Sequence, residues 1–406
     1  MSLRPTRPHD PFVLRRVAAM LAGASVIAAG AVLGAAGSAT VTSPTARDLQ
    51  PPAPPTSLTE ARNAACSAGR RFQAVSRGLG PFCTPPDSIR AIDDPSFSTA
   101  SRVSFLDPGE PVIAVEAGGE ARAYPVRVLV WHEIANDEVG GVPLAVTFCP
   151  LCNSPVTFDR RVEGRELTFG VSGRLIRGNL VMFDRETETL WQQLTGEALR
   201  GEYEGERLSL VPSRMIPFED FRQAFPDGLV MTTETGLDAA YGEDPYAGYG
   251  VDPEQPSSFQ FGSEADPRLP PKERVLGIIS GNESAAVVFP EGRGERRVVE
   301  TSVGGRDVVV LLTYGAGQPA TTGSFGSQTP GWAGSAFLQD ADGQPVSLRA
   351  GPEGFVDRET GTVFNVSGEA IRGSLAGSSL KPVPSLDSFW FAWSFFYPET
   401  TVVFSD

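Results

Sequence analysis

One segment of this chain occurs twice, and this internal repeat constrains the fold more than any other feature. Residues 183–213 are FDRETETLWQQLTGEALRGEYEGERLSLVPS, and residues 356–385 are VDRETGTVFNVSGEAIRGSLAGSSLKPVPS. Asp-Arg-Glu-Thr at 184–187 aligns with 357–360, and Val-Pro-Ser at 211–213 aligns with 383–385. So many matches in one register indicate a duplication. We therefore expect two similarly folded halves packed into one unit.

The composition predicts a mainly β fold of the α+β class with short helices. The chain has 44 glycines and 41% hydrophobic residues, but few long apolar helical patterns. We expect the following parts: a signal peptide or N-terminal membrane anchor (1–39), a Pro-rich linker (40–56), an N-terminal helix with a loop (57–99), a first β-rich repeat (100–235), a connecting segment (236–273) and a second β-rich repeat (274–406).

The N-terminal region predicts export. Residues 17–36 are uncharged and follow a basic stretch that includes Arg15 and Arg16. This pattern is typical of a signal peptide or a membrane anchor, so we expect the remainder to be extracytoplasmic. Disulfides persist in that setting, and the spacing of Cys66 and Cys83 predicts a disulfide between them.

The charge balance excludes one class of partner. The formal net charge is −15 and the isoelectric point is near 4.8. Nucleic-acid binding needs basic patches that neutralise phosphates, so we expect no nucleic-acid partner.

The candidate site centres on a Cys-x-x-Cys motif. Gly140-Gly141 predicts a tight turn, and the apolar run after it predicts a strand that ends at Cys149, with Cys152 three residues later. His132 is the only histidine outside the N-terminal tail. The second half has Gly315 where the first has Cys149, which places the chemistry in the first half.

Neighbouring patterns predict local structure. Residues 111–116 and 120–124 should form a hairpin. Pro125 should begin a short helix over 126–134, for which a β-branched strand is the alternative, and Asn136-Asp137 should end this element. The recurrence of Asp184–Thr187 in the half without cysteines favours a turn with internal hydrogen bonds. We expect Trp191, Trp390 and Trp393 to lie in the core. The tyrosines of the connecting segment either pack a crossover loop or line a site.

Three long motifs resemble a known family. They are AYPVRVLVWHEIANDEVGGVPLAVTFCPLCNSPVTFDR, FGVSGRLIRGNLVMFDRETETLWQQLTGEALRG and FWFAWSFFYPET. Together they resemble the family of domain of unknown function 3179 over residues 87–404. That family has no established activity, but some relatives are described as selenoproteins. The resemblance therefore implies redox chemistry at Cys149 and Cys152, because selenium brings faster exchange to a thiol position.

Three interpretations of the motif stay open. In the first, Cys149 and Cys152 form a thiol redox centre assisted by His132, which acts on an unknown redox partner or small-molecule substrate. In the second, the same three residues bind zinc or copper, with Glu133 or Asp137 as a fourth ligand. In the third, the cysteines form a structural disulfide in a non-catalytic protein. The first two predict close sulfurs and a His132 ring within about 4–6 Å of them.

Overall fold

The computed structural model describes residues 85–255 and 266–405. These residues belong to one compact unit that spans 54–406. The predicted N-terminal segment at 17–36, the linker and the Cys66–Cys83 pair lie outside the described residues. Within the described ranges, no helix is long and apolar enough to cross a membrane.

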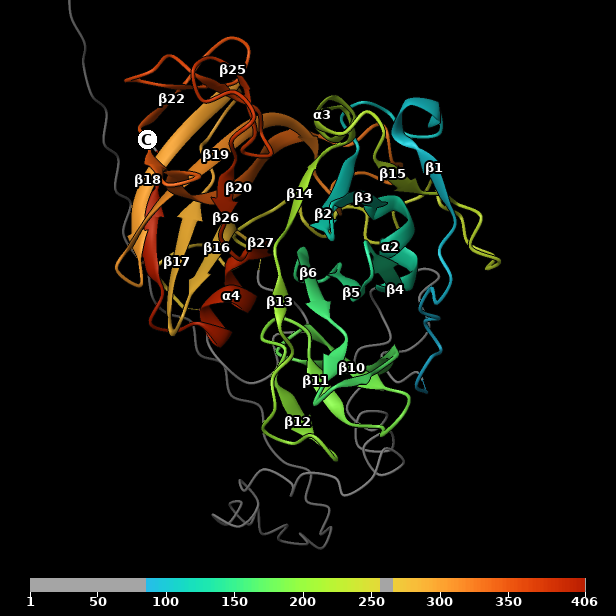
Figure 1. Ribbon diagram of the computed structural model, residues 1–406. Helices are drawn as coiled ribbons and strands as arrows, with labels where there is room; N and C mark the ends of the chain where they lie inside the picture. The colour runs from blue at the N-terminus through green and yellow to red at the C-terminus, as the bar shows by residue number, and fades with distance from the viewer. Residues whose placement is uncertain (1–84, 256–265, 406) are drawn as a thin grey trace, which may run out of the picture. The chain divides into compact units, whose positions relative to one another are not determined.

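The fold is mainly β, as predicted (Figure 1), and the described residues of its first half contain three principal sheets. One has the strand order β1-β15-β3-β2-β14, the second β13-β6-β5-β4 and the third β12-β11-β10-β9, while β7 and β8 form a separate hairpin. The strands are β1 (Phe97–Thr99), β2 (Pro111–Ala117), β3 (Glu120–Pro125), β4 (Ile134–Val139), β5 (Val142–Cys149), β6 (Ser154–Asp159), β7 (Arg161–Val162), β8 (Arg165–Glu166), β9 (Phe169–Ile176), β10 (Asn179–Asp184), β11 (Leu190–Gln192), β12 (Ala198–Arg200), β13 (Leu210–Val211), β14 (Ser213–Pro217) and β15 (Leu229–Met231).

The second half also contains three sheets. Their orders are β27-β16-β17-β28, then β18-β19-β20-β21 with β26 paired to β20, and β22-β23-β24-β25. The strands are β16 (Arg274–Ser280), β17 (Glu283–Val288), β18 (Arg296–Val303), β19 (Arg306–Gly317), β20 (Pro330–Ala341), β21 (Gln344–Pro345), β22 (Leu348–Ala350), β23 (Phe355–Asp357), β24 (Val363–Phe364), β25 (Ala370–Arg372), β26 (Leu380–Pro382), β27 (Ser385–Phe389) and β28 (Thr401–Phe404).

Strand order recurs between the halves. The path β15-β3-β2-β14 corresponds to β28-β17-β16-β27, and each path contains one parallel pair, β15 with β3 and β28 with β17. The path β4-β5-β6-β13 corresponds to β18-β19-β20-β26, and β9 to β12 correspond to β22 to β25. This recurrence is what the repeated sequence predicts, while the duplication itself stays an inference from the sequence.

The helices of the described residues are short. They are η1 (Ala100–Arg102), α2 (Val126–His132), α3 (Phe218–Ala224) and α4 (Trp390–Phe396). The helix predicted after Pro125 begins where expected but ends at His132, because Glu133 takes the left-handed conformation with φ 60°. The predicted end of this element at Asn136-Asp137 is wrong, since both residues lie within β4, paired with β5. Their pairing with a buried strand, which local sequence does not encode, decides this conformation.

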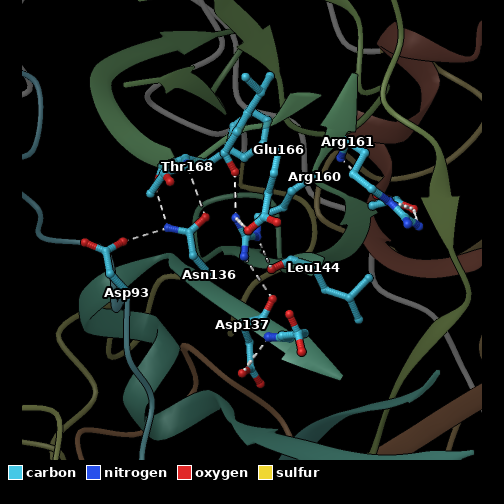
Figure 2. Close-up of polar contacts among 12 residues, drawn as sticks. Asp93, Asn136, Asp137, Leu144, Arg160, Arg161, Glu166 and Thr168 are labelled. Atoms are coloured by element: carbon cyan, nitrogen blue, oxygen red, sulfur yellow. Dashed lines mark hydrogen bonds and ion pairs between the residues drawn. The ribbon is translucent and has the colours of Figure 1, made fainter. Parts of the chain in front are cut away.

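A buried arginine fixes β4 and β5 to the chain that follows β6 (Figure 2). Arg160 is 7% exposed, and its guanidinium donates to the carbonyl oxygens of Leu144 (3.1 Å), Leu167 (2.7 Å) and Asp137 (3.2 Å). Asn136 exchanges hydrogen bonds with the backbone of Phe169 at 2.8 and 2.9 Å. Backbone groups at this sheet boundary are thereby satisfied, as buried polar groups must be.

The halves share their hydrophobic core. One cluster of buried side chains contains Trp191, Cys149 and Cys152 from the first half together with Trp390 and Trp393 from the second. All three predicted core tryptophans are 0% exposed, which confirms that prediction. Strand β27 also lies beside β6. The second half therefore packs directly against the strand that follows the cysteine motif.

Candidate thiol site

The cysteines lie at the two ends of a tight connection between β5 and β6. Cys149 is the last residue of β5, and β6 begins at Ser154. The Cys152 N–H donates to the Cys149 carbonyl oxygen at 3.2 Å, which closes a four-residue turn with Pro150 at its second position. Proline favours that position because its φ is already set. The turn brings both side chains toward the same neighbours.

Both thiols are free, buried and directed at one acceptor. Cys149 is 2% exposed and Cys152 is 0% exposed. The Cys149 Sγ lies 3.8 Å from the Gly178 carbonyl oxygen, and the Cys152 Sγ lies 3.3 Å from the same atom. Gly178 takes a left-handed φ of 81° in the turn between β9 and β10. The sulfurs therefore converge beside a single carbonyl group.

The two thiols interact electrostatically. The pKa of Cys152 lies well above its ordinary value, first because of burial, then because of the hydrogen bond and charge of Cys149. Asn179 opposes this change through a hydrogen bond, while the charge of Glu133 adds to it. Cys152 therefore stays protonated at neutral pH, and removing its proton requires a nearby base.

A buried polar network supports the turn that carries the cysteines. Gln193 accepts from Asn179 Nδ2 at 2.9 Å and from Ser154 Oγ at 3.1 Å. Its own amide donates to Thr147 Oγ1 at 2.9 Å and to the Ser154 carbonyl oxygen at 3.0 Å. Because these residues come from β5, β6, β10 and the segment after β11, the network holds four chain segments in register around the sulfurs.

Glu133 supplies an unusual acid to this site. Its side chain is 8% exposed, and burial raises its pKa from 4.5 to about 8. In the described parts of the chain, no side chain forms an ion pair or a hydrogen bond with this carboxyl group. Its charge acts on both Cys152 and Tyr246. A carboxylic acid with a pKa near neutrality can exchange a proton with a neighbouring group under ordinary conditions.

The ring nitrogens of His132 are hydrogen-bonded to residues other than the two cysteines. Its Nδ1 lies 2.7 Å from the Arg90 carbonyl oxygen and its Nε2 lies 2.8 Å from the Tyr241 hydroxyl. Burial lowers its pKa from 6.5. Both ring nitrogens therefore have partners in the loop before β1 and in the connecting segment, and it is the next residue, Glu133, whose charge reaches Cys152.

Two further polar residues border the thiols. Asn153 is 2% exposed, follows Cys152 directly and takes a φ of 50°. Neither of its amide atoms has a hydrogen-bond partner. Tyr246 belongs to the connecting segment, and its pKa lies well above the ordinary value because of burial first and the charges of Glu133 and Cys149 next. The sequence left open whether the tyrosines of the connecting segment pack a loop or line a site. Tyr246 lies close enough to the thiols for the charge of Cys149 to affect its pKa.

The second half covers the turn. The Phe389 N–H donates to the Cys152 carbonyl oxygen at 2.8 Å. Phe389 and Phe391 belong to the same apolar cluster as the two cysteines, and the Phe389 ring lies 6.2 Å from that of Tyr249. The half without thiols therefore packs directly against the thiol turn of the other half.

The chain also matches a family model over residues 86–400. The chain belongs to the DUF3179 family, which is described as a protein of unknown function. No curated protein and no solved structure shows a significant match. The match confirms the expected resemblance. For this DUF3179 protein, any activity must therefore be argued from its own geometry.

The predicted metal ligands do not assemble into a metal cluster in this DUF3179 chain. Across residues 85–255 and 266–405, no group of three or more His, Cys, Asp or Glu side chains is arranged to hold a metal ion. Asp137, one proposed fourth ligand, instead accepts hydrogen bonds from Arg122 at 2.7 Å and from the Tyr124 hydroxyl at 2.5 Å. The other, Glu133, is the one whose charge acts on Cys152.

The repeated acidic turn is structural, as its recurrence predicted. Asp184 accepts from the Thr187 N–H at 2.6 Å and from the Trp191 indole N–H at 2.9 Å. In the second half, Asp357 accepts from the Thr360 N–H at 2.9 Å and from its hydroxyl at 2.7 Å. The same carboxylate caps the same turn in both halves of this DUF3179 protein, which confirms the hydrogen-bonded turn.

Proposed function

We propose that Cys149 and Cys152 form a dithiol–disulfide centre that reduces small hydroperoxides outside the cytoplasm. The observation that carries the proposal is the convergence of two free thiols on one carbonyl oxygen, beside a carboxylic acid whose pKa is about 8. Small size is required of the oxidant because both sulfurs are buried, and a protein disulfide would not reach them without rearrangement.

Cys149 is assigned as the attacking thiol. It is slightly more exposed than Cys152, whose raised pKa disfavours the thiolate that attack requires. In the first step the Cys149 sulfur bonds to the terminal peroxide oxygen, the O–O bond breaks, and an alcohol leaves. The thiol proton passes through Glu133 to the departing alkoxide. The product at Cys149 is a sulfenic acid.

Cys152 then resolves the intermediate. Its sulfur attacks the Cys149 sulfenic sulfur, the S–O bond breaks, and water leaves as the disulfide forms. The Cys152 proton accompanies the departing hydroxide. Two equivalents of an external thiol, as reductant, return the pair to its dithiol state and leave as an external disulfide. Selenium in relatives, as the family resemblance implies, agrees with a redox role at this turn.

The test follows each thiol separately. The wild-type protein is treated with one equivalent of hydrogen peroxide, and the products are mapped by mass spectrometry. We expect a Cys149–Cys152 disulfide in the wild type, a trapped sulfenic acid at Cys149 in Cys152→Ser, and no reaction at Cys152 in Cys149→Ser. Glu133→Gln should slow the wild-type reaction at pH 7 by about 10²-fold or more. The matched control, Glu138→Gln, removes an exposed carboxylate from the same segment.

Two outcomes would refute the proposal. One is that Glu133→Gln reacts with peroxide at the same rate as the wild type and that Cys149 remains unoxidised in both proteins. The other is stoichiometric zinc or copper in protein purified without oxygen, lost in Cys149→Ser. That result would establish the metal-binding alternative, and elemental analysis before peroxide treatment decides it.

A further inference from the structure

A second polar site lies in the part of the fold that corresponds to the thiol turn. In the second half, residues 318–329 connect β19 to β20. At the end of β19, the Gly317 N–H donates to the carbonyl oxygen of Gly109 in the first half at 2.7 Å. A cavity of about 130 Å³ lies at this contact. It is lined by Asp107, Glu110, Gln328, Pro330 and four glycines, Gly109, Gly315, Gly317 and Gly326.

Gln328 carries the argument that this cavity holds a ligand. Its side chain is 8% exposed, and neither the amide nitrogen nor the amide oxygen has a hydrogen-bond partner. An unpaired buried polar group costs about 1–3 kcal/mol, so native proteins rarely keep one without a partner. A side chain in the wall of a cavity with one free donor group and one free acceptor indicates a ligand that offers both.

The glycines keep the cavity open. A Cβ atom at Gly317 would lie 2.6 Å from Gln328 Oε1, and one at Gly326 would lie 2.2 Å from Asp107 Oδ2. Both distances are shorter than real Cβ contacts allow. Any larger residue at either position would therefore push against the polar atoms that line the space.

The remaining polar atoms at the cavity are mostly acceptors. The carboxylates of Asp107 and Glu110 both lie near Gly326, and the Gly315 carbonyl oxygen lies beside Gly109. Arg127 neutralises Glu110 through two hydrogen bonds of 2.7 Å. The charge of Asp107 remains, so the cavity favours a ligand with one positive charge and several N–H donors.

We propose that this cavity binds a small primary ammonium compound with an adjacent amide, of the size of an α-amino amide. The ammonium group donates to Asp107 and to the Gly315 carbonyl oxygen. The ligand's carbonyl oxygen accepts from Gln328 Nε2, and its amide N–H donates to Gln328 Oε1. Each free polar atom of Gln328 thereby gains a partner. This proposal does not depend on the thiols.

A hard metal ion fits the same atoms less well. Both oxygens of Glu110 are already engaged by the permanently charged Arg127, which would repel a cation held by that carboxylate. The cavity would then offer an ion too few oxygens for the six to eight that calcium takes. Calcium therefore serves as the probe for this alternative in the binding experiment.

The experiment measures binding to the full chain by isothermal titration calorimetry with four probes: glycinamide, acetamide, methylammonium and calcium. We expect saturable binding of glycinamide, with at least tenfold weaker binding of acetamide, which lacks the charge, and of methylammonium, which lacks the amide. Gln328→Leu and Asp107→Asn should each weaken glycinamide binding by at least tenfold. Their matched controls, Gln344→Leu and Asp94→Asn, change exposed side chains of the same types and should leave it unchanged.

Three results would overturn the proposal. They are the absence of saturable glycinamide binding, equal binding of acetamide, and tighter binding of calcium than of glycinamide. The first would mean that the unpaired amide of Gln328 does not mark a site for this class of ligand. Should Gln328→Leu fail to fold, Asp107→Asn still decides the matter because Asp107 is exposed and its replacement does not alter the core.

Discussion

Glu133 combines an unfavourable backbone conformation with burial that disfavours its charged form. It is a non-glycine residue at φ 60°, directly after a helix, and its carboxyl group is buried. Asn153 and Arg177, which adjoin Cys152 and Gly178, share the left-handed conformation at φ 50° and 52°. Such backbone strain gathers at functional sites, where the surrounding structure maintains it. Three strained residues thus border one pair of sulfurs.

The raised pKa of Glu133 gives the folding stability a specific pH dependence. Unfolding returns the carboxyl group from a pKa of about 8 to 4.5, so between these values the folded state holds a proton that the unfolded state releases. This group's contribution to stability is therefore fully present below pH 4.5, falls as the pH rises, and is lost above pH 8. Each pKa unit corresponds to about 1.4 kcal/mol, which gives a total on the order of 5 kcal/mol.

Urea denaturation of the wild type and Glu133→Gln across this range provides the measurement. We expect the variant to become progressively more stable relative to the wild type as the pH rises from 5 to 8. Parallel stability curves for the two proteins would contradict a raised pKa at Glu133, since all other titrating groups are common to both.

The acidic turn offers a second prediction at the residue scale. Asp184→Ala leaves the buried Trp191 indole N–H without its 2.9 Å partner, whereas Asp357→Ala exposes no comparable indole. We expect Asp184→Ala to lose about 1–3 kcal/mol more stability than the same change at Asp357. Chemical denaturation measures both, and an equal loss would show that the indole bond contributes nothing.

At the scale of elements, two glycine turns are packed against each other. A Cβ at Gly140 would lie 2.4 Å from the Ala117 carbonyl oxygen, while a Cβ at Gly141 would meet nothing within 4 Å. Both glycines have positive φ, of 53° and 78°. Replacing either with alanine costs the conformational strain of about 1 kcal/mol, but only Gly140→Ala adds a backbone collision.

We therefore expect Gly140→Ala to be several kcal/mol less stable than Gly141→Ala, with thermal unfolding as the measurement. The second variant is the matched control, because it changes the same residue type in the same turn. Similar melting temperatures would mean that the two hairpins can separate at little cost.

Local sequence signals predicted most elements but missed strand β4 and the exact end of α2. The hairpin of β2 and β3, the start of α2 and the strand that ends at Cys149 follow from Gly-Gly turns, Pro125 and a short apolar run. Strand β4 was missed because its conformation depends on pairing with β5. The end of α2 at His132 decides which of two adjacent residues acts on Cys152, and one left-handed residue is not visible in a sequence pattern.

Elements distant in sequence completed the site in ways that no local pattern encodes. Gly178, Tyr246 and Phe389 reach the thiols from a turn, a crossover segment and the second half. A glycine turn and a tyrosine-rich connection are ordinary features by themselves. The cysteine motif was the sequence signal on which the candidate site rests, whereas its neighbours follow from tertiary packing.

At the scale of the whole molecule, the second half acts as the cover of the thiol turn. Phe389 is 2% exposed and packs in the cluster that contains both cysteines. Phe389→Ala should cost about 3–5 kcal/mol and open this cover. We expect native-state alkylation of Cys149 and Cys152 by iodoacetamide to accelerate at least tenfold. Phe404→Ala, at a 61% exposed position, should change neither quantity, and unaltered alkylation in a folded Phe389→Ala protein would refute the covering role.

The hydrogen bond from Phe389 to the Cys152 carbonyl group also orders events in time. Contacts between residues far apart in the chain form late, because closing a long loop costs entropy before any contact repays it. During synthesis and refolding, the β5–β6 turn can exist while its cover does not. The sulfurs are then open to any oxidant in their surroundings, and docking of the C-terminal half closes this interval. Under the proposed redox function, the oxidation state of the folded protein would then depend on the relative rates of folding and of thiol oxidation.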